Sequence, residues 1–383
     1  MRSVEPIHPS ADVVPLGRFD VHDIETIRLV LRGSSVVDWV SLHFKSLQEI
    51  DAFIRVNELD PDDARDRLRL LSLLRRAVQY LEEHLRYEVP EVIKNADDVR
   101  FLFRCASQTK GRRSHRFYAC LTLKVMHIIN HSDAHELAST VQVSQAEISV
   151  LLHAKIERTV RGLLEREFPI VEFTGNLKRP YSVYSKLLAK KDTQSAQIFD
   201  KLRFRLVVAR LEDIAPLLLA LTRELVPFNY VVPGQTHNSL IDLYRMLVRA
   251  GNMTAIRAEE GRDINEPPVT DMSEDRRNEF SGPDYQVVNL VADIPLRIDR
   301  VFALDALTRD LGPVVFGAVE FQIVDQVTAL QNESGENRHA LYKARQRAVV
   351  KQRLERGKRA PQPAGEDETV SSDRPLDRRR REA

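Results

Sequence analysis

Side chains that could bind a polyphosphate and its metal ion gather in one short stretch of the sequence. Lys178 follows a glycine in a predicted turn, and Ser182 and Lys186 come next, spaced one helical turn apart. Asp200 and Arg205 follow, the arginine inside a run that alternates apolar and polar residues. Lysine and arginine neutralise phosphate oxygens, and a carboxylate is a hard oxygen ligand suited to Mg²⁺. This order of residue types predicts a site for a polyphosphate and a magnesium ion.

The elements that position these residues can be predicted from the periodicity of the sequence. A strand is expected at 170–174, a turn at 175–178, and a short amphipathic helix behind that turn. The alternation over 203–208 predicts a second strand. Its apolar residues, Phe204 and Leu206, are expected on one face and its two arginines on the other.

A second group of polar residues occurs much later in the chain. Tyr285, Gln286 and Asn289 belong to one predicted strand, and Glu320 lies inside a strongly apolar strand at 314–324. A buried carboxylate without a partner is costly, so Glu320 is a candidate functional acid. The ring of Tyr285 offers a purine a stacking platform, although the role of an ordinary strand residue explains it equally well.

These segments resemble, in order and spacing, the synthetase domain of the RelA/SpoT family, the (p)ppGpp-forming pyrophosphokinases. In that family a G-R-x-K turn is followed by Y-S-I-Y-x-K, Y-D-L-x-x-x-R, N-G-Y-Q-S-L-H-T and E-x-Q-I-R. The corresponding segments of this chain are 175–178, 181–186, 199–205, 285–292, 320–324 and a closing helix at 336–343. Asn176 stands where the family has arginine, and Asn289 where it has histidine. The resemblance covers under half of the chain.

The resemblance implies transfer of the β,γ-pyrophosphate of ATP to the 3′-hydroxyl of GDP or GTP. Such transfers depend mainly on positioning and on neutralising charge. By the same resemblance, Asp200 and Glu320 hold Mg²⁺ and are the catalytic residues, and Glu320 also orients or deprotonates the acceptor hydroxyl. The remaining implied roles are ATP-phosphate binding by Lys178, Ser182, Lys186 and Arg205, and acceptor binding by Tyr285, Gln286 and Asn289.

Several alternatives remain open at this point. The acids and lysines also fit an ordinary solvated ion-pair network. The departures at Asn176 and Asn289 favour a different acceptor, such as an adenine nucleotide or the 3′ end of tRNA, or a catalytically weak nucleotide- or RNA-binding regulatory module. Retention of two acids and two lysines favours the enzyme.

The fold class predicted for the whole chain is α+β, with an all-helical N-terminal domain beside a mixed β-sheet nucleotidyltransferase-like domain flanked by helices. The predicted divisions are an irregular N-terminus at 1–19, a helical domain of unknown role at 20–167, a synthetase-like domain at 168–345 with an insertion at about 241–284, and a basic helix end with a disordered tail at 346–383.

Further elements are predicted from capping residues and apolar spacing. Asp60 and the proline behind it start one long helix, and a capping box at 144–147 starts another. A Leu-rich helix is expected at 211–225, followed by a strand at 226–232.

Three histidines share one face of the helix expected at about 114–139. They are His127, His131 and His135, at the spacing i, i+4, i+8. Histidines four residues apart on a helix can bind a metal, but no second cluster of acidic ligands accompanies them. The pattern therefore favours a structural histidine face over a metal site.

Composition favours a cytoplasmic protein without membrane contact. The 383 residues are 43% hydrophobic and 30% charged, and no apolar run approaches the roughly 20 residues that cross a bilayer. Only two cysteines are present, and the N-terminus lacks an apolar signal core. The expected partners are ATP and a GDP- or GTP-like acceptor. The arginine-rich C-terminal end also suits RNA or the ribosome, although such ends are more often solubilising.

Overall fold

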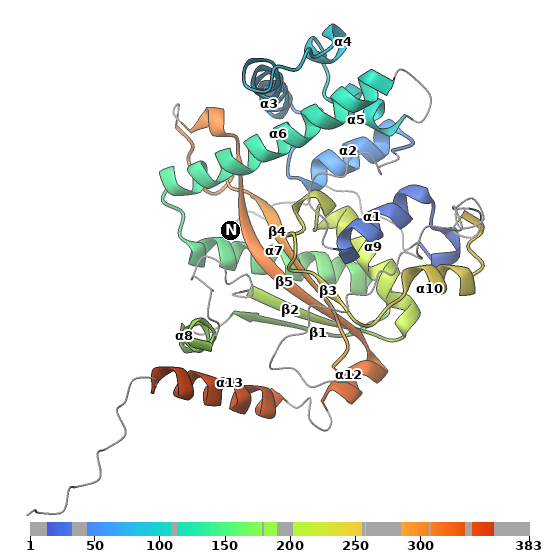
Figure 1. Ribbon diagram of the computed structural model, residues 1–383, viewed down its shortest axis with the longest axis vertical. Helices are drawn as coiled ribbons and strands as arrows, with labels where there is room; N and C mark the ends of the chain where they lie inside the picture. The colour runs from blue at the N-terminus through green and yellow to red at the C-terminus, as the bar shows by residue number, and fades with distance from the viewer. Residues whose placement is uncertain are drawn as a thin grey trace, which may run out of the picture.

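The computed structural model describes residues 14–32, 44–108, 113–177, 180–189, 202–254, 257, 285–305, 308–333 and 339–355. Within these ranges the chain forms an α+β fold, which confirms the predicted class. A helical N-terminal region leads into a five-stranded mixed sheet, and further helices flank the sheet (Figure 1).

The sheet is built from segments that lie far apart in the sequence. The strands are β1 (Ile170–Leu177), β2 (Leu202–Val208), β3 (His237–Asn238), β4 (Val288–Arg297) and β5 (Val314–Asp325). Their order across the sheet is β1-β2-β5-β4-β3. The β2–β5 pair is parallel and the other pairs are antiparallel. The long β5 therefore lies at the centre.

The helices before the sheet include those predicted from Asp60, at about 114–139 and from the capping box at 144–147. They are α1 (Val21–Arg32), α2 (Leu47–Val56), α3 (Ala64–Glu83), α4 (Glu91–Lys94), α5 (Arg100–Ser107), α6 (Arg113–Thr140) and α7 (Gln145–Glu165). The predicted capping box is present, because Ser144 Oγ accepts from the Glu147 amide while the Glu147 carboxylate accepts from the Ser144 amide. At α3 the cap is Asp63, three residues after the aspartate that was expected to start this helix.

The remaining helices follow or interrupt the strands. They are α8 (Pro180–Ala189), α9 (Ile214–Glu224), α10 (Leu243–Arg249), α12 (Gln326–Asn332) and α13 (His339–Leu354), with 3₁₀ turns η1 (Leu16–Arg18), η5 (Leu211–Asp213), η6 (Phe228–Tyr230) and η7 (Arg309–Leu311). No helix within the described ranges combines the length and hydropathy needed to cross a bilayer.

Two local predictions are wrong. The turn expected at 175–178 begins too early, because β1 continues to Leu177 and its Asn176 pairs with Arg203 of β2. The strand expected at 226–232 is reduced to one isolated antiparallel bridge, between Val231 and Ala292 of β4. The centre of this segment is the 3₁₀ turn η6, in which Phe228 stacks on Phe53 of α2 with ring centroids 4.8 Å apart. Packing against α2 thus prevails over the β propensity of this segment.

One face of the sheet is covered by α7, α9 and α1. The predicted inward residues of β2, Phe204 and Leu206, are fully buried there, which confirms the assignment of the two faces. The helix α7 packs so closely that a Cβ atom on Gly317 of β5 would overlap Leu152 and approach Ile148 Cγ2 at 2.8 Å. The polar residues of the strands therefore point to the opposite face.

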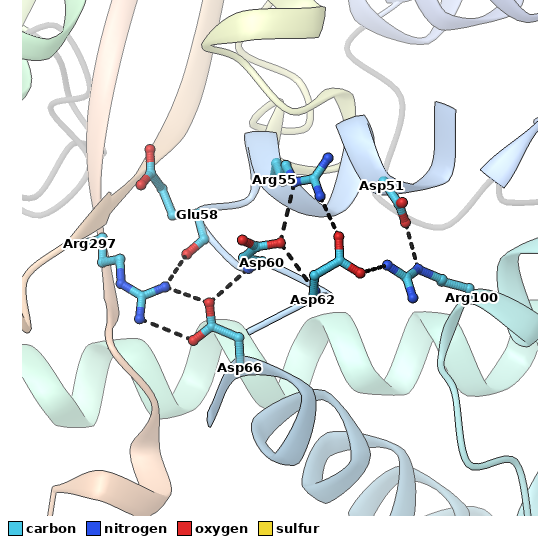
Figure 2. A network of polar contacts seen from close by, with 8 residues as sticks. All are labelled: Asp51, Arg55, Glu58, Asp60, Asp62, Asp66, Arg100 and Arg297. Atoms are coloured by element: carbon cyan, nitrogen blue, oxygen red, sulfur yellow. Dashed lines mark hydrogen bonds and ion pairs between the residues drawn. The ribbon is translucent and has the colours of Figure 1, made fainter. Parts of the chain in front are cut away.

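The helical N-terminal region is bound to the end of β4 by buried charges. Arg297 of β4 binds the carboxylate of Asp66 in α3 through both terminal nitrogens, at 2.5 and 3.1 Å (Figure 2). Lys155 of α7 lies 2.6 Å from the Glu58 carboxylate and donates to the Pro295 carbonyl of β4 at 2.7 Å. These contacts hold the α2–α3 connection against the sheet.

Candidate functional site

All five strands contribute side chains to the sheet face opposite α7. Residues aligned across neighbouring strands share a face, and so do residues two apart along a strand. One aligned row is Thr174, Arg205, Gln322, Asn289 and His237. The next row is Asn176, Arg203, Glu320 and Val291. The register thus places three of the predicted site residues, Arg205, Asn289 and Glu320, together with Asn176, on one face.

Glu320 lies in the middle of this face on the central strand. Its side chain is buried, with the residue 8% exposed. Arg203 occupies the aligned position on the parallel neighbour β2, and Gln322 donates from Nε2 to Glu320 Oε1 at 3.3 Å. A buried acid beside an aligned arginine fits a site that handles phosphate and an oxygen-bound cation.

Arg205 and Asn289 lie in the adjacent row. Arg205 Nη1 is 3.0 Å from Glu333 Oε1, an ion pair whose acidic partner is 63% exposed. Exposed pairs of this kind contribute at most about 1 kcal/mol, so a phosphate can displace the glutamate. Asn289 Oδ1 is buried and has no hydrogen-bond partner among the described residues. A buried polar atom of this kind fits a ligand that supplies a donor.

Tyr285 and Gln286 lie where β4 begins, near α12. Asn332 of α12 accepts from the Gln286 amide at 3.1 Å and donates to its carbonyl at 2.7 Å. Tyr285 is half-buried and packs against an apolar cluster formed by Val207, Val287, Val324 and Ala329. The backbone that carries the tyrosine is thus fixed, and the ring lies at the α12 end of the polar face.

The remaining predicted site residues are only partly described. Lys178 and Asp200 lie outside the described residues. Ser182 and Lys186 belong to α8, as the sequence predicted, but their side chains lie outside the described set. The helices α8 and α13 lie side by side, and Arg353 of α13 donates to the Leu188 carbonyl at 2.7 Å (Figure 1).

The structure adds residues that were not predicted for the site. Arg203 and His237 lie in the two rows described above, and Asp293 of β4 lies on the same face. Tyr285, Asn289 and Asp293 are separated by even numbers of residues, so the alternation of a strand could have predicted that Asp293 shares the face of Asn289. No sequence pattern predicts that His131 of α6 lies 3.2 Å from its carboxylate.

The histidine face of α6 is largely structural. His127 is buried, its Nδ1 lies 3.2 Å from Asn229 Nδ2, and burial lowers its pKa to about 3. Among the described residues there is no cluster of three or more potential metal-ligating side chains, here or elsewhere. Burial also lowers the pKa of the His135 imidazole, so a neutral ring is favoured there too.

Comparison with known proteins gives structural neighbours only. No family model matches the chain, and no curated protein sequence matches it. The small alarmone synthetase 1 from Bacillus subtilis, solved with its product pppGpp, is 16% identical over 55% of this chain and 90% of its own, with a TM-score of 0.29.

Two further neighbours are similar in kind. The small alarmone synthetase 2 from Bacillus subtilis is 14% identical, over 54% of this chain and 93% of its own, with a TM-score of 0.27. A GTP pyrophosphokinase family protein from Streptococcus pneumoniae is 11% identical, over 58% and 87%, with a TM-score of 0.26. All three are of the kind that the sequence motifs resemble.

Glu320 is suited to hold a magnesium ion. Its carboxylate supplies the hard oxygen that Mg²⁺ prefers, and it is buried on the polar face of the sheet. The second predicted ligand, Asp200, precedes the first described residue of β2, Leu202, by two positions in the sequence. Among the described residues, Glu320 is therefore the one predicted ligand available to hold the magnesium ion.

Proposed function

We propose that this protein is a pyrophosphokinase that transfers the β,γ-pyrophosphate of ATP to the 3′-hydroxyl of a guanine nucleotide. The observation that carries the proposal is the alignment of Glu320 with Arg203, and of Gln322 with Arg205 and Asn289, on one sheet face. A buried acid with one arginine at the aligned position and a second arginine in the next row combines metal binding with phosphate binding.

Each group has a defined task in this proposal. The arginines of β2 and the lysines at 178 and 186 neutralise the ATP phosphates, and Ser182 donates a hydrogen bond to one of them. Glu320 and Asp200 hold Mg²⁺, which neutralises the charge that develops during transfer. Glu320 also accepts a hydrogen bond from the acceptor hydroxyl, which orients its oxygen for attack. Tyr285 stacks on the acceptor base, and Gln286 and Asn289 bind its polar edge.

The proposal is tested by incubating the full chain with γ-³²P-labelled ATP, Mg²⁺ and separate acceptors: GDP, GTP, ADP and bulk tRNA. We expect label to move to GDP or GTP, and Glu320→Gln to lower the rate by roughly 10²–10⁴-fold. The matched control is Glu212→Gln, an exposed acid beyond the end of β2, which should keep full activity.

The other outcomes separate the alternatives. Label on tRNA or ADP instead would retain the reaction and replace the acceptor. ATP binding without transfer to any acceptor would contradict the enzyme and favour a nucleotide-binding regulatory module. Equal rates for Glu320→Gln and the wild type would refute the assignment of Glu320.

A further inference from the structure

The helical N-terminal region places one polar pair on the face that carries Glu320. His131 of α6 lies with Nε2 3.2 Å from Oδ2 of Asp293 in β4. Asp293 is aligned with Ala318, two residues before Glu320 on β5, and therefore shares its face. Two residues of a strand span about 7 Å. The pair thus lies one short step from the proposed catalytic acid.

The imidazole ring of His131 is held in place by aromatic neighbours. Its centroid lies 5.0 Å from that of Phe316, 5.8 Å from that of Tyr230 and 4.7 Å from that of His135. Tyr230 is itself fixed, because its hydroxyl accepts from Asn130 Nδ2 at 3.1 Å. The His131 side chain nevertheless remains 30% exposed. A rigid ring with an accessible edge suits ligand binding.

The carboxylate partner determines what this edge can bind. An ionised Asp293 only accepts hydrogen bonds, so it favours the tautomer of neutral His131 with the proton on Nε2. Nδ1 then carries a lone pair, and this atom has no hydrogen-bond partner within the described ranges. The ligand group that matches it is a hydrogen-bond donor. The adjacent negative charge disfavours a phosphate and favours a neutral hydroxyl.

We propose that His131, oriented by Asp293, binds the 2′-hydroxyl of the acceptor ribose whose 3′-hydroxyl is presented to Glu320. This inference rests on the proposed pyrophosphokinase function and adds the chemical basis of acceptor selection. The two hydroxyls are neighbours on one sugar ring, as the two protein groups are neighbours on one sheet face. The helical region would thereby select ribonucleotides over 2′-deoxyribonucleotides.

The variant Asp293→Asn separates this role from a purely structural tether. An asparagine amide can donate to Nε2 and preserve the contact with α6. Because an asparagine side chain offers both a donor and an acceptor, it no longer fixes the ring proton on Nε2 or the lone pair on Nδ1. A tether would survive this change, whereas binding of a hydroxyl proton at a fixed Nδ1 lone pair would weaken. Asp293 acts as a positioning residue, and His131 as the residue that contacts the acceptor.

The experiment measures the ratio of kcat/KM for GDP to kcat/KM for 2′-deoxy-GDP. If tRNA is the acceptor, tRNA ending in adenosine is compared with tRNA ending in 2′-deoxyadenosine. We expect the wild type to prefer the ribose form by roughly three- to tenfold, the value of one hydrogen bond. In His131→Ala the ratio should fall to about 1, and in Asp293→Asn it should fall below the wild-type value, while the KM for ATP stays unchanged in both.

A matched control lies on the same helix. His115 is sixteen residues from His131, about 24 Å along α6, so His115→Ala should keep the wild-type ratio. Circular dichroism checks that each variant is folded. A ratio that stays at its wild-type value in Asp293→Asn and His131→Ala would overturn the inference, and so would a wild type that does not discriminate.

Failure of the proposed reaction can be distinguished from failure of this inference. If the wild type transfers no label, calorimetric binding of GDP and 2′-deoxy-GDP to the same variants replaces the kinetic ratio. A binding preference lost in Asp293→Asn then supports the ribose contact without the reaction. If neither GDP nor 2′-deoxy-GDP binds to the wild type, the proposed ribose contact is overturned as well.

Discussion

The buried ion pair between Arg297 and Asp66 should make the helical region and the sheet depend on each other for stability. Asp66 is 1% exposed, and its carboxylate accepts both terminal nitrogens of Arg297 as well as the Asp60 amide at 2.7 Å (Figure 2). The perturbation is Asp66→Ala, which leaves the guanidinium buried without this partner.

The expected magnitude follows from the partners that remain. Removing one member of a buried pair costs about 3–5 kcal/mol. Arg297 keeps Asp299 at 2.9 Å and the Glu58 carbonyl at 3.3 Å, so we expect the lower end, about 3 kcal/mol. The matched control is Asp62→Ala in the same network. Asp62 is 61% exposed, and loss of its pairs with Arg55 and Arg100 should cost about 1 kcal/mol or less.

The assay is equilibrium urea unfolding of the full chain, followed by far-ultraviolet circular dichroism. Asp66→Ala should lower the midpoint with an unchanged slope, because the same surface is exposed on unfolding. A double-mutant cycle with Arg297→Met should give a coupling energy of about 1.5 kcal/mol or more. A loss for Asp66→Ala no larger than that for Asp62→Ala would refute the reasoning.

Two further predictions concern the stability of the protein, at the buried His127 and at glycines packed against or on α7. Since burial lowers the folded-state pKa of His127 to about 3 from a usual 6.5, stability is fully present above pH 6.5 and falls as the pH drops toward 3. His127→Gln should lessen the loss between pH 8 and pH 5 by about 2 kcal/mol, measured by urea unfolding at both pH values, and equal losses would contradict this. Gly317→Ala should cost about 1–3 kcal/mol because its methyl group meets Ile148 and Leu152. Gly162→Ala in α7, where a Cβ meets nothing within 4 Å, should instead raise the thermal midpoint.

Local elements could be predicted well because their signals lie within a few residues. The capping residues Ser144 and Glu147 establish where α7 begins, since their hydrogen bonds are made within one turn. The alternation around Phe204 likewise predicts which side of β2 is buried, because a strand has a period of two. The α+β class followed from the change of pattern between the two halves of the chain.

Segments without a decisive local signal were predicted less well. The segment 226–232 contains β-branched and aromatic residues, yet its centre is a 3₁₀ turn because Phe228 is stacked on α2. The length of β1 was underestimated because its end at Leu177 is stabilised by pairing with Leu202 on another strand. In both cases a tertiary contact prevails over weak local preference.

The sequence by itself determined the residue types of the candidate site and the faces on which single strands present them. Only the tertiary structure decided which of them meet. The parallel pairing of β2 with β5 aligns Arg203 with Glu320, and α6 brings His131 to Asp293, 162 residues further along the chain. The physical reason is that a period of two specifies a side of one strand, whereas strand order, register and helix packing arise from burial of the whole core.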